Sequence, residues 1–203
     1  MRISVKSVVA DFEENLLKIG FERTGKRTIL LNIGDDFFGW VGINSGIMAN
    51  SVAINPHVGV HSKKIMELSA QISGSKYEYG KYATISKYLG TVDRSLPQLI
   101  VRDKSDLKRA LSLFQESMLK YGVPFMRQYN NYEALLPVLL DNVSRLGGYP
   151  ERVAICYHLM GKDSTALRFL DDLKDSFWEE NNNYGIQYVD SFHERFHVLV
   201  SDC

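Results

Sequence analysis

The hydrophobic and polar positions between residues 20 and 61 alternate in three stretches that predict β-strands. Residues 28–33 and 37–43 are rich in β-branched and aromatic side chains, and turn residues separate them. Residues 52–61 alternate apolar positions with small or polar ones, which predicts a half-buried strand with His57 and His61 on its outer side. Pro56 has no N–H, so we expect this strand to lie at a sheet edge or to carry a bulge.

Apolar residues at helical spacing predict helices on both sides of these strands. The first helix spans residues 5–19 and ends at Gly20. The second spans residues 62–72, with Ser62 as its N-cap. A third begins at Asp103 or Ser105 and ends at residues 121–124, where the sequence reads Tyr-Gly-Val-Pro. Between the last two helices, residues 82–92 and 96–101 are predicted to form further strands.

The chain after residue 130 has a helical pattern throughout. Helices are predicted over residues 132–143, which include Pro137, and over residues 151–160, 164–177 and 191–200. Pro137 is tolerated if its helix begins near Leu136 or kinks. Pro150 suits the first turn of the helix that follows it. Residues 151–160 and 164–177 form an antiparallel hairpin in this prediction, and residues 181–183 form a loop.

These elements together predict an α+β fold: an antiparallel sheet of about four or five strands, flanked by helices, with a C-terminal helical hairpin. We expect an α+β sheet region in residues 1–102 and a helical region in residues 103–203, packed together as one compact domain.

Charge and composition narrow the classes of function. The 24 basic and 24 acidic residues balance, and no basic block occurs, which argues against nucleic-acid binding. No apolar run approaches the ~20 residues that cross a bilayer, so no membrane association is predicted. Two distant cysteines and the absence of a secretory leader pattern predict a reduced, cytoplasmic protein.

His193-Glu194-Arg195-Phe196-His197 matches the H-E-x-x-H pattern of zinc hydrolases. On a helix the two histidines share a face and can bind zinc, with Glu194 as general base. Ser191 and Glu194 also form a possible capping box. Such enzymes need a third protein ligand, however, and Asp202 is the one plausible candidate downstream. We therefore favour a structural or solvent-facing pair of histidines.

Other motifs carry no coherent chemistry. The segment from Gly20 to Arg27 has the glycine spacing of a phosphate loop, but Arg27 stands where Ser or Thr would hold magnesium. Adjacent carboxylates, such as Asp171 and Asp172, point to different faces and do not converge on one site. Cys156 lies on an apolar helix face and does not resemble an activated nucleophile. No cofactor is indicated.

Aromatic and acidic residues are the remaining candidates for binding a protein. Exposed aromatic residues make good interface anchors, and acidic clusters suit a basic partner. Phe38 and Trp40 are instead expected to fill the core. The candidate partner-binding residues are Asp35, Asp36, Phe37, Tyr77, Tyr79, Tyr82, Asp171, Asp172 and Asp175, with Glu179 and Glu180 extending the last cluster.

The order of several segments resembles a known kind of domain. These are residues 18–21 (KIGF), Trp40, residues 120–125 (KYGVPF), residues 153–161 (VAICYHLMG) and residues 166–170 (ALRFL). They resemble a family of uncharacterised bacterial α+β domains with a C-terminal helical hairpin, some of which are similar to immunity proteins that neutralise a toxin. The resemblance implies the fold above and a role in binding another protein.

The sequence thus predicts a non-enzymatic protein-binding module, of the kind that occludes a partner protein as immunity proteins and antitoxins do. Two alternatives remain open: a zinc-dependent hydrolase that uses His193, Glu194 and His197, and an adaptor subunit that docks through its helical hairpin. The oligomeric state is open as well.

Overall fold

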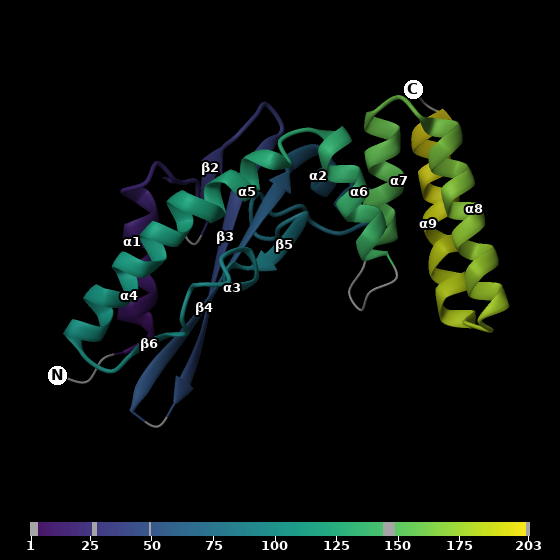
Figure 1. Ribbon diagram of the computed structural model, residues 1–203. Coiled ribbons are helices and arrows are strands. Elements are labelled where there is room, and N and C mark those ends of the chain that lie inside the picture. The colour runs from purple at the N-terminus through teal and green to yellow at the C-terminus, as the bar shows by residue number, and fades with distance from the viewer. Residues whose placement is uncertain (1–3, 26–27, 49, 144–148, 202–203) are drawn as a thin grey trace. The chain divides into compact units, whose positions relative to one another are not determined.

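The computed structural model describes residues 4–25, 28–48, 50–143 and 149–201. The chain forms two compact units, and neither is continuous in sequence (Figure 1). Unit 1 comprises Met1–Ser62 and Tyr79–Asn130, and unit 2 comprises Lys63–Glu78 and Asn131–Cys203. The expected border at residue 102 falls inside unit 1.

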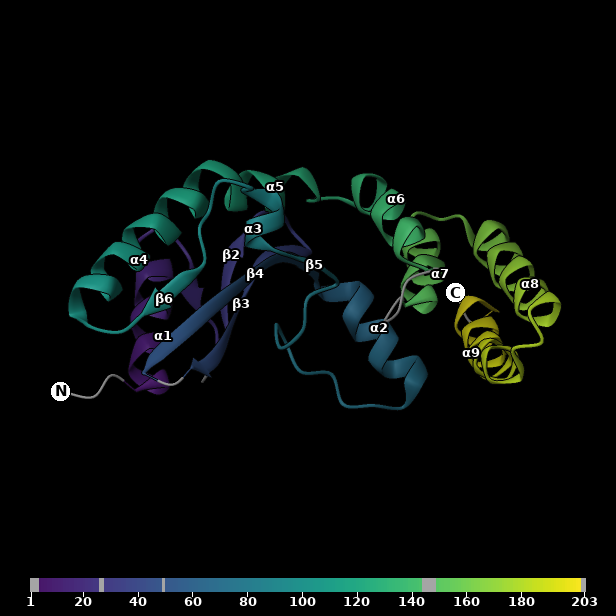
Figure 2. The same cartoon turned by 60° about the horizontal axis from the view of Figure 1, so that its bottom comes forward.

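Unit 1 is built on an antiparallel sheet, which confirms the α+β prediction. The strands in the described residues are β1 (Glu22–Arg23), β2 (Ile29–Asn32), β3 (Phe37–Met48), β4 (Ser51–Ser62), β5 (Ile85–Tyr88) and β6 (Leu99–Val101). Their order is β1-β2-β3-β4-β5, and β6 also pairs with β4. The long β3–β4 hairpin is the centre of this sheet (Figure 2).

The helices of unit 1 pack their apolar stripes on the sheet and on one another. They are α1 (Val5–Leu17), α3 (Leu89–Val92), α4 (Lys104–Ser117), the π-helix Met118–Gly122 and α5 (Val123–Gln128). Phe12 of α1 and Phe114 of α4 are fully buried, with ring centroids 5.0 Å apart. Gly20 has a φ of 94°, which explains why α1 ends close to it. Asp103 is the N-cap of α4 and accepts hydrogen bonds from the backbone N–H groups of Ser105 and Asp106.

Residues 121–124 do not end the helical segment as the sequence predicts. The chain passes through a π-helical turn, in which the Val123 N–H donates to the Met118 carbonyl. Pro124 then lies in the first turn of α5, a position that tolerates proline. The extra residue of the π-turn lets the helical segment continue past Gly122 and Pro124, which would otherwise end it.

β4 is buried on both faces, which corrects the prediction of a half-buried strand. His61 is fully buried although it lies on the expected outer side, and Ala53 is also buried. β4 is moreover a central strand, because β3 pairs along one edge and β5 and β6 along the other. β5 pairs with residues 57–60 and β6 with residues 52–54, so Pro56 lies in the gap between them. The missing N–H is therefore accommodated without an edge strand.

Ser62 is the last residue of β4 and directly precedes Lys63, where the next helix begins, so it occupies the predicted N-cap position; its hydroxyl donates to Asp36 at 2.6 Å. A prediction near β5 is wrong in detail. The predicted strand over residues 82–92 is shorter, because α3 begins at Leu89 directly after β5.

Unit 2 is a helical bundle in the described residues. Its helices are α2 (Lys63–Ser73), α6 (Tyr132–Asn142), α7 (Pro150–Leu159), α8 (Asp163–Glu179) and α9 (Asn183–Ser201). Each of α6 to α9 packs against the next, and α2 packs against α7 and α9. The predicted hairpin is confirmed, with Gly161 at a φ of 70° between α7 and α8, and α9 extends it.

The signals for helix ends in unit 2 are partly correct. Pro150 lies in the first turn of α7 as predicted. Gly147 and Gly148, which predict a break before this helix, lie outside the described residues. Asn131 caps α6, which begins at Tyr132, so Pro137 lies inside the helix. α9 begins at Asn183 and not near Ser191, after a turn in which Asn181 has a φ of 55° and the Asn182 side chain accepts a hydrogen bond from Gly185. No helix in the described ranges is long and apolar enough to span a membrane.

Candidate functional site

His61 holds the chain after Glu78 against the sheet of unit 1. Its Nδ1 lies 2.8 Å from the Tyr82 carbonyl oxygen, and its Nε2 lies 3.3 Å from the Gly80 N–H. A carbonyl only accepts and an N–H only donates, so Nδ1 is the donor and Nε2 the acceptor in these two hydrogen bonds. The Tyr79 ring packs edge-on against it at 5.6 Å. His61 therefore has a structural role.

A second buried polar cluster joins the turn before β3, the end of β4 and the residue before β5. The Ser62 hydroxyl donates to Asp36, and the Ser62 N–H donates to the Thr84 hydroxyl at 2.8 Å. Asp36 and Phe37 are both buried, whereas Asp35 is exposed. A partner can reach Asp35 but reaches Asp36 and Phe37 only if the fold opens. Asp36 and Phe37 are therefore not available as partner contacts in the folded protein.

The predicted tyrosine cluster is divided between the units. Tyr77 is half-buried and belongs to unit 2. Tyr79 is half-buried in unit 1 between the rings of Phe38 and His61, and burial raises its pKa. Tyr82 is exposed, with the Lys81 ammonium 5.1 Å from its ring centroid. The structure thus does not gather these three tyrosines on one unit.

The acidic cluster of α8 lies on an exposed helix face with Trp178. The residues Ala166, Leu170, Leu173 and Phe177 follow the helical repeat on the inner side. Asp171, Asp172, Asp175 and Glu179 follow it on the opposite side and are exposed. Trp178, three residues after Asp175, has 70% of its surface exposed. An indole this exposed beside Asp175 on an outer helix face is not explained by packing within unit 2.

The start of α9 extends this surface with a second aromatic residue. Tyr184 is 81% exposed, and it follows the short turn after α8. Gly185 contacts the Phe177 ring, where an added Cβ would lie 2.7 Å from it, so the two helices approach closely there. We call Asp171, Asp172, Asp175, Trp178, Glu179 and Tyr184 the α8–α9 surface. The sequence pattern identified the acids but not Trp178 or Tyr184. Trp178 could have been identified, because it does not fall on the inner apolar stripe of α8 and is therefore expected to be exposed.

The two units carry opposite net charges, which the balanced total conceals. Unit 1 contains 15 Lys and Arg residues and 10 Asp and Glu residues, a net charge of +5. Unit 2 contains 9 and 14, a net charge of −5. The α8–α9 surface therefore belongs to an acidic unit, and a positively charged partner is attracted to it over a distance of about one Debye length, ~8 Å at physiological salt.

The histidine motif lies within α9 and not at its start. Ser191 is therefore no N-cap, and its carbonyl and hydroxyl oxygens accept hydrogen bonds from Arg195. The His193 Nε2 lies 3.6 Å from an Asp171 carboxylate oxygen, and the His197 Nδ1 lies 3.2 Å from the Ser201 hydroxyl. The two imidazole centroids are 6.5 Å apart. Asp202, the candidate third ligand, lies outside the described residues, and those described contain no group of three ligands placed for a metal ion.

α7 carries a buried pair of charged residues that the sequence did not reveal. Glu151 accepts a hydrogen bond of 2.7 Å from the Tyr188 hydroxyl of α9, and the Arg152 guanidinium lies 3.8 Å above the Tyr149 ring. Burial, together with the Glu151 carboxylate, raises the pKa of Tyr188 above its usual range. Tyr188 consequently remains a hydrogen-bond donor that joins α9 to α7.

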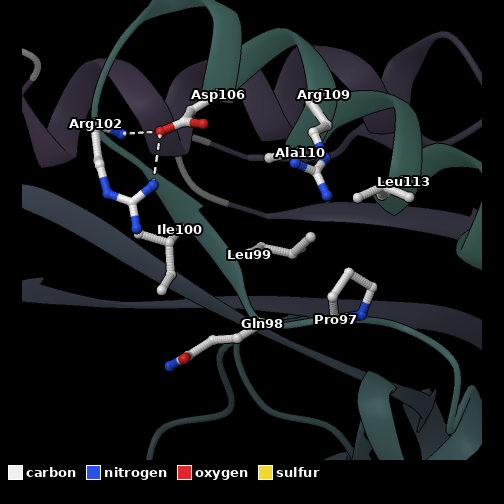
Figure 3. Close-up of a pocket in the computed structure, with 9 residues that line it drawn as sticks. All are labelled: Pro97, Gln98, Leu99, Ile100, Arg102, Asp106, Arg109, Ala110 and Leu113. Atoms are coloured by element: carbon white, nitrogen blue, oxygen red, sulfur yellow. Dashed lines mark hydrogen bonds and ion pairs between the residues drawn. The ribbon is translucent and has the colours of Figure 1, made fainter.

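A small pocket in unit 1 lies between β6 and α4 (Figure 3). The Arg102 side chain and backbone N–H both donate to Asp106, and the Arg109 side chain extends from α4 toward β6. Leu99, Ala110 and Leu113 supply apolar walls. Its volume of about 150 Å³ is well below the ~300–1,000 Å³ of typical small-molecule sites. It has room for one side chain or a small ion.

Cys156 is fully buried in α7, and its thiol lies 3.6 Å from the Tyr132 carbonyl oxygen. Burial, with a smaller effect of Glu133, raises the pKa of this thiol to about 12. The thiolate is the reactive form, so the group stays protonated and unreactive at neutral and moderately alkaline pH.

We expect the folded Cys203→Ser variant, in which Cys156 is the remaining thiol, to resist Ellman's reagent at pH 8. Reaction should be at least ~100-fold slower than in urea-unfolded protein, because the thiol is both protonated and enclosed. Absorbance at 412 nm measures this rate. Equal rates in folded and unfolded protein would contradict the burial of Cys156.

Comparisons with known proteins were made at three levels: no family model, no curated protein and no solved structure matches the chain. The proposed function therefore rests on the geometry of this chain's own residues.

Proposed function

We propose that the protein is a non-enzymatic binding module that captures a basic protein partner through the α8–α9 surface. The observation that supports this most directly is that Trp178 and Tyr184 are exposed on the same unit as several exposed acids. These acids are Asp171, Asp172, Asp175 and Glu179. Tryptophan and tyrosine are the residues that most often dominate the free energy of protein interfaces.

The electrostatics of unit 2 support the same partner chemistry. Its net charge of −5 favours encounter with a basic surface, and the exposed carboxylates of α8 can pair with Lys or Arg once the Trp178 indole is buried. Lys174 does not oppose this, because its ammonium is paired with Asp190 at 2.6 Å.

The mechanism we propose is occlusion: the acidic and aromatic face covers a basic region of the partner, such as the nucleic-acid or phosphate site of a toxin. The resemblance to immunity-like domains supports this finer assignment, as does the lack of a converging catalytic cluster in the described residues. The prediction that the partner has a basic surface can be tested before the partner is identified.

The test is affinity capture from cell extract with tagged protein, followed by titration of the captured partner in a calorimeter. Trp178→Ala should weaken binding by roughly 30-fold, the effect of losing one aromatic hot spot of ~2 kcal/mol. Asp171→Asn, Asp172→Asn and Asp175→Asn combined should weaken binding and reduce its dependence on salt.

A matched charge control comes from exposed acids of unit 1. Asp11→Asn, Glu22→Gln and Glu116→Gln combined change the net charge by the same amount but leave α8 intact. This variant should bind as the wild type does. If the partner binds all variants equally, or if no basic partner is captured, the proposed function is wrong.

A further inference from the structure

Among the described residues, the second half of β3 forms a long unpaired edge of the unit 1 sheet. β2 pairs with β3 only as far as Trp40, which lies opposite Leu30. β4 pairs with β3 along its whole length, to Met48. From Gly42 to Met48 no described strand pairs with the other edge of β3. Strand edges of this kind expose backbone N–H and C=O groups that another strand can pair with.

This edge differs from the other open edges of the sheet, which are short and charged. β1 consists of Glu22 and Arg23, β5 contains Lys87, and the three-residue β6 is followed by Arg102. The segment from Gly42 to Met48 reads GINSGIM and has no charged residue. Proteins usually protect edge strands with lysine, proline or a bulge, and the described register of β3 shows none of these.

A pocket lies where this open edge begins. It has a volume of about 220 Å³ and is lined in part by Trp40, Gly42, Ile43, Gly80 and Lys81. The Trp40 indole N–H donates to the Gly80 carbonyl oxygen at 3.0 Å, which fixes the ring. A Cβ on Gly42 would lie 2.4 Å from the same ring, so the indole covers the backbone there. The Trp40 indole therefore forms one wall of the pocket, next to Gly42, which has no side chain.

We propose that β3 pairs with β3 of a second copy of this chain, antiparallel and about a two-fold axis at Ser45. In this register Ile43 lies opposite the second copy's Ile47, and Gly42 lies opposite the second copy's Met48. Both pairs occur twice, as the symmetry of an isologous dimer requires.

The side chains at these positions are complementary in this register. Ile47 is 83% exposed at the end of the hairpin, and pairing buries it against Ile43 on the same face of the sheet. The second copy's Met48 reaches the Trp40 pocket across Gly42, where a thioether contacts an aromatic ring favourably. Because the segment is uncharged, the self-pairing brings no like charges together. A strand with charged residues opposite Gly42 and Ile43 would lose these apolar contacts.

One seven-residue strand pair buries less surface than the ~1,600 Å² of a standard interface, so the dimer should form and dissociate with concentration. The first experiment is sedimentation velocity over a concentration range of about a hundredfold. We expect the mass to rise from one chain toward two. Ile47→Lys should keep the mass at one chain at every concentration, because it places two charges across the new strand pair.

Val198→Lys is the matched control, since Val198 is a 60% exposed apolar residue on α9 of unit 2. This variant should dimerise as the wild type does. Far-ultraviolet circular dichroism must show that both variants are folded. A wild type that stays monomeric, or a dimer that Ile47→Lys leaves intact, overturns the proposal.

The register itself is tested by cross-linking in the Cys203→Ser background. Ser45→Cys places the two new thiols opposite each other, so mild oxidation should give a covalent dimer in high yield. Ser86→Cys on β5 should give little. The reverse result overturns the β3 pairing even if a dimer forms.

Discussion

Replacing Gly59 by alanine should destabilise unit 1 by about 3 kcal/mol. Gly59 lies opposite Ser86 in the β4–β5 ladder, and an added Cβ would lie 2.1 Å from the Ile85 carbonyl oxygen. The obstructing atom belongs to the backbone, so no side-chain rotation relieves the contact and β5 must move away from β4. In a chain of this length such a loss lowers the Tm by roughly 6–12 °C.

Urea unfolding followed by circular dichroism measures the change in the free energy of unfolding. Gly46→Ala is the control, because a Cβ there meets no atom within 4 Å. That variant should change stability by no more than about 0.5 kcal/mol. If both alanine variants have the same free energy of unfolding, β4 and β5 do not approach each other closely at Gly59.

His61→Ala should cost about 3 kcal/mol of unit 1 stability, since it removes both hydrogen bonds of a fully buried imidazole. The Tyr82 carbonyl and the Gly80 N–H lose their ring partner, and Tyr79 loses an edge-on aromatic contact. The segment after Glu78 should become open to proteolysis at lower urea concentrations than in the wild type.

His57→Ala provides the comparison, because His57 is a histidine on the same strand. His57 is only half-buried, and its Nδ1 lies 3.2 Å from the exposed Asn44 side chain. Its replacement should cost less than about 1 kcal/mol. A loss at His61 no larger than the loss at His57 would show that the imidazole does not hold this segment.

The sequence predicted the features of the fold that short-range chemistry determines. Gly20, Asp103 and Pro150 each lie at a helix end, as their side chains or backbone preferences require. The predictions that failed depend on residues far away in sequence. Nothing near Pro56 shows that β5 and β6 leave a gap beside it, and nothing near His61 shows that residues 80–82 cover the outer face of β4.

The candidate site was predictable in part for the same reason. The acids of α8 follow the helical repeat opposite its apolar stripe, so their exposure could be predicted from spacing alone. Asp36 looked equally polar in sequence, but Ser62 binds it in the interior. Ser191 looked like a cap because Glu194 follows it at capping-box spacing, but α9 already begins at Asn183, directly after the left-handed Asn181.

The interleaving of the two units sets an order of events during synthesis of the chain. α2 leaves the ribosome directly after β4, but the remaining helices of unit 2 follow only after residue 130. The helices that α2 packs against are α7 and α9, and α7 ends at Leu159, 86 residues after Ser73. At ~5–20 residues per second, α2 waits roughly 4–17 s before the first of them is complete, with Ile65 and Ile72 uncovered. Unit 1 is completed within that interval. At this stage the nascent chain consists of the complete unit 1 and a helix whose apolar face is still exposed. A chaperone that binds exposed apolar segments is expected to act at this stage.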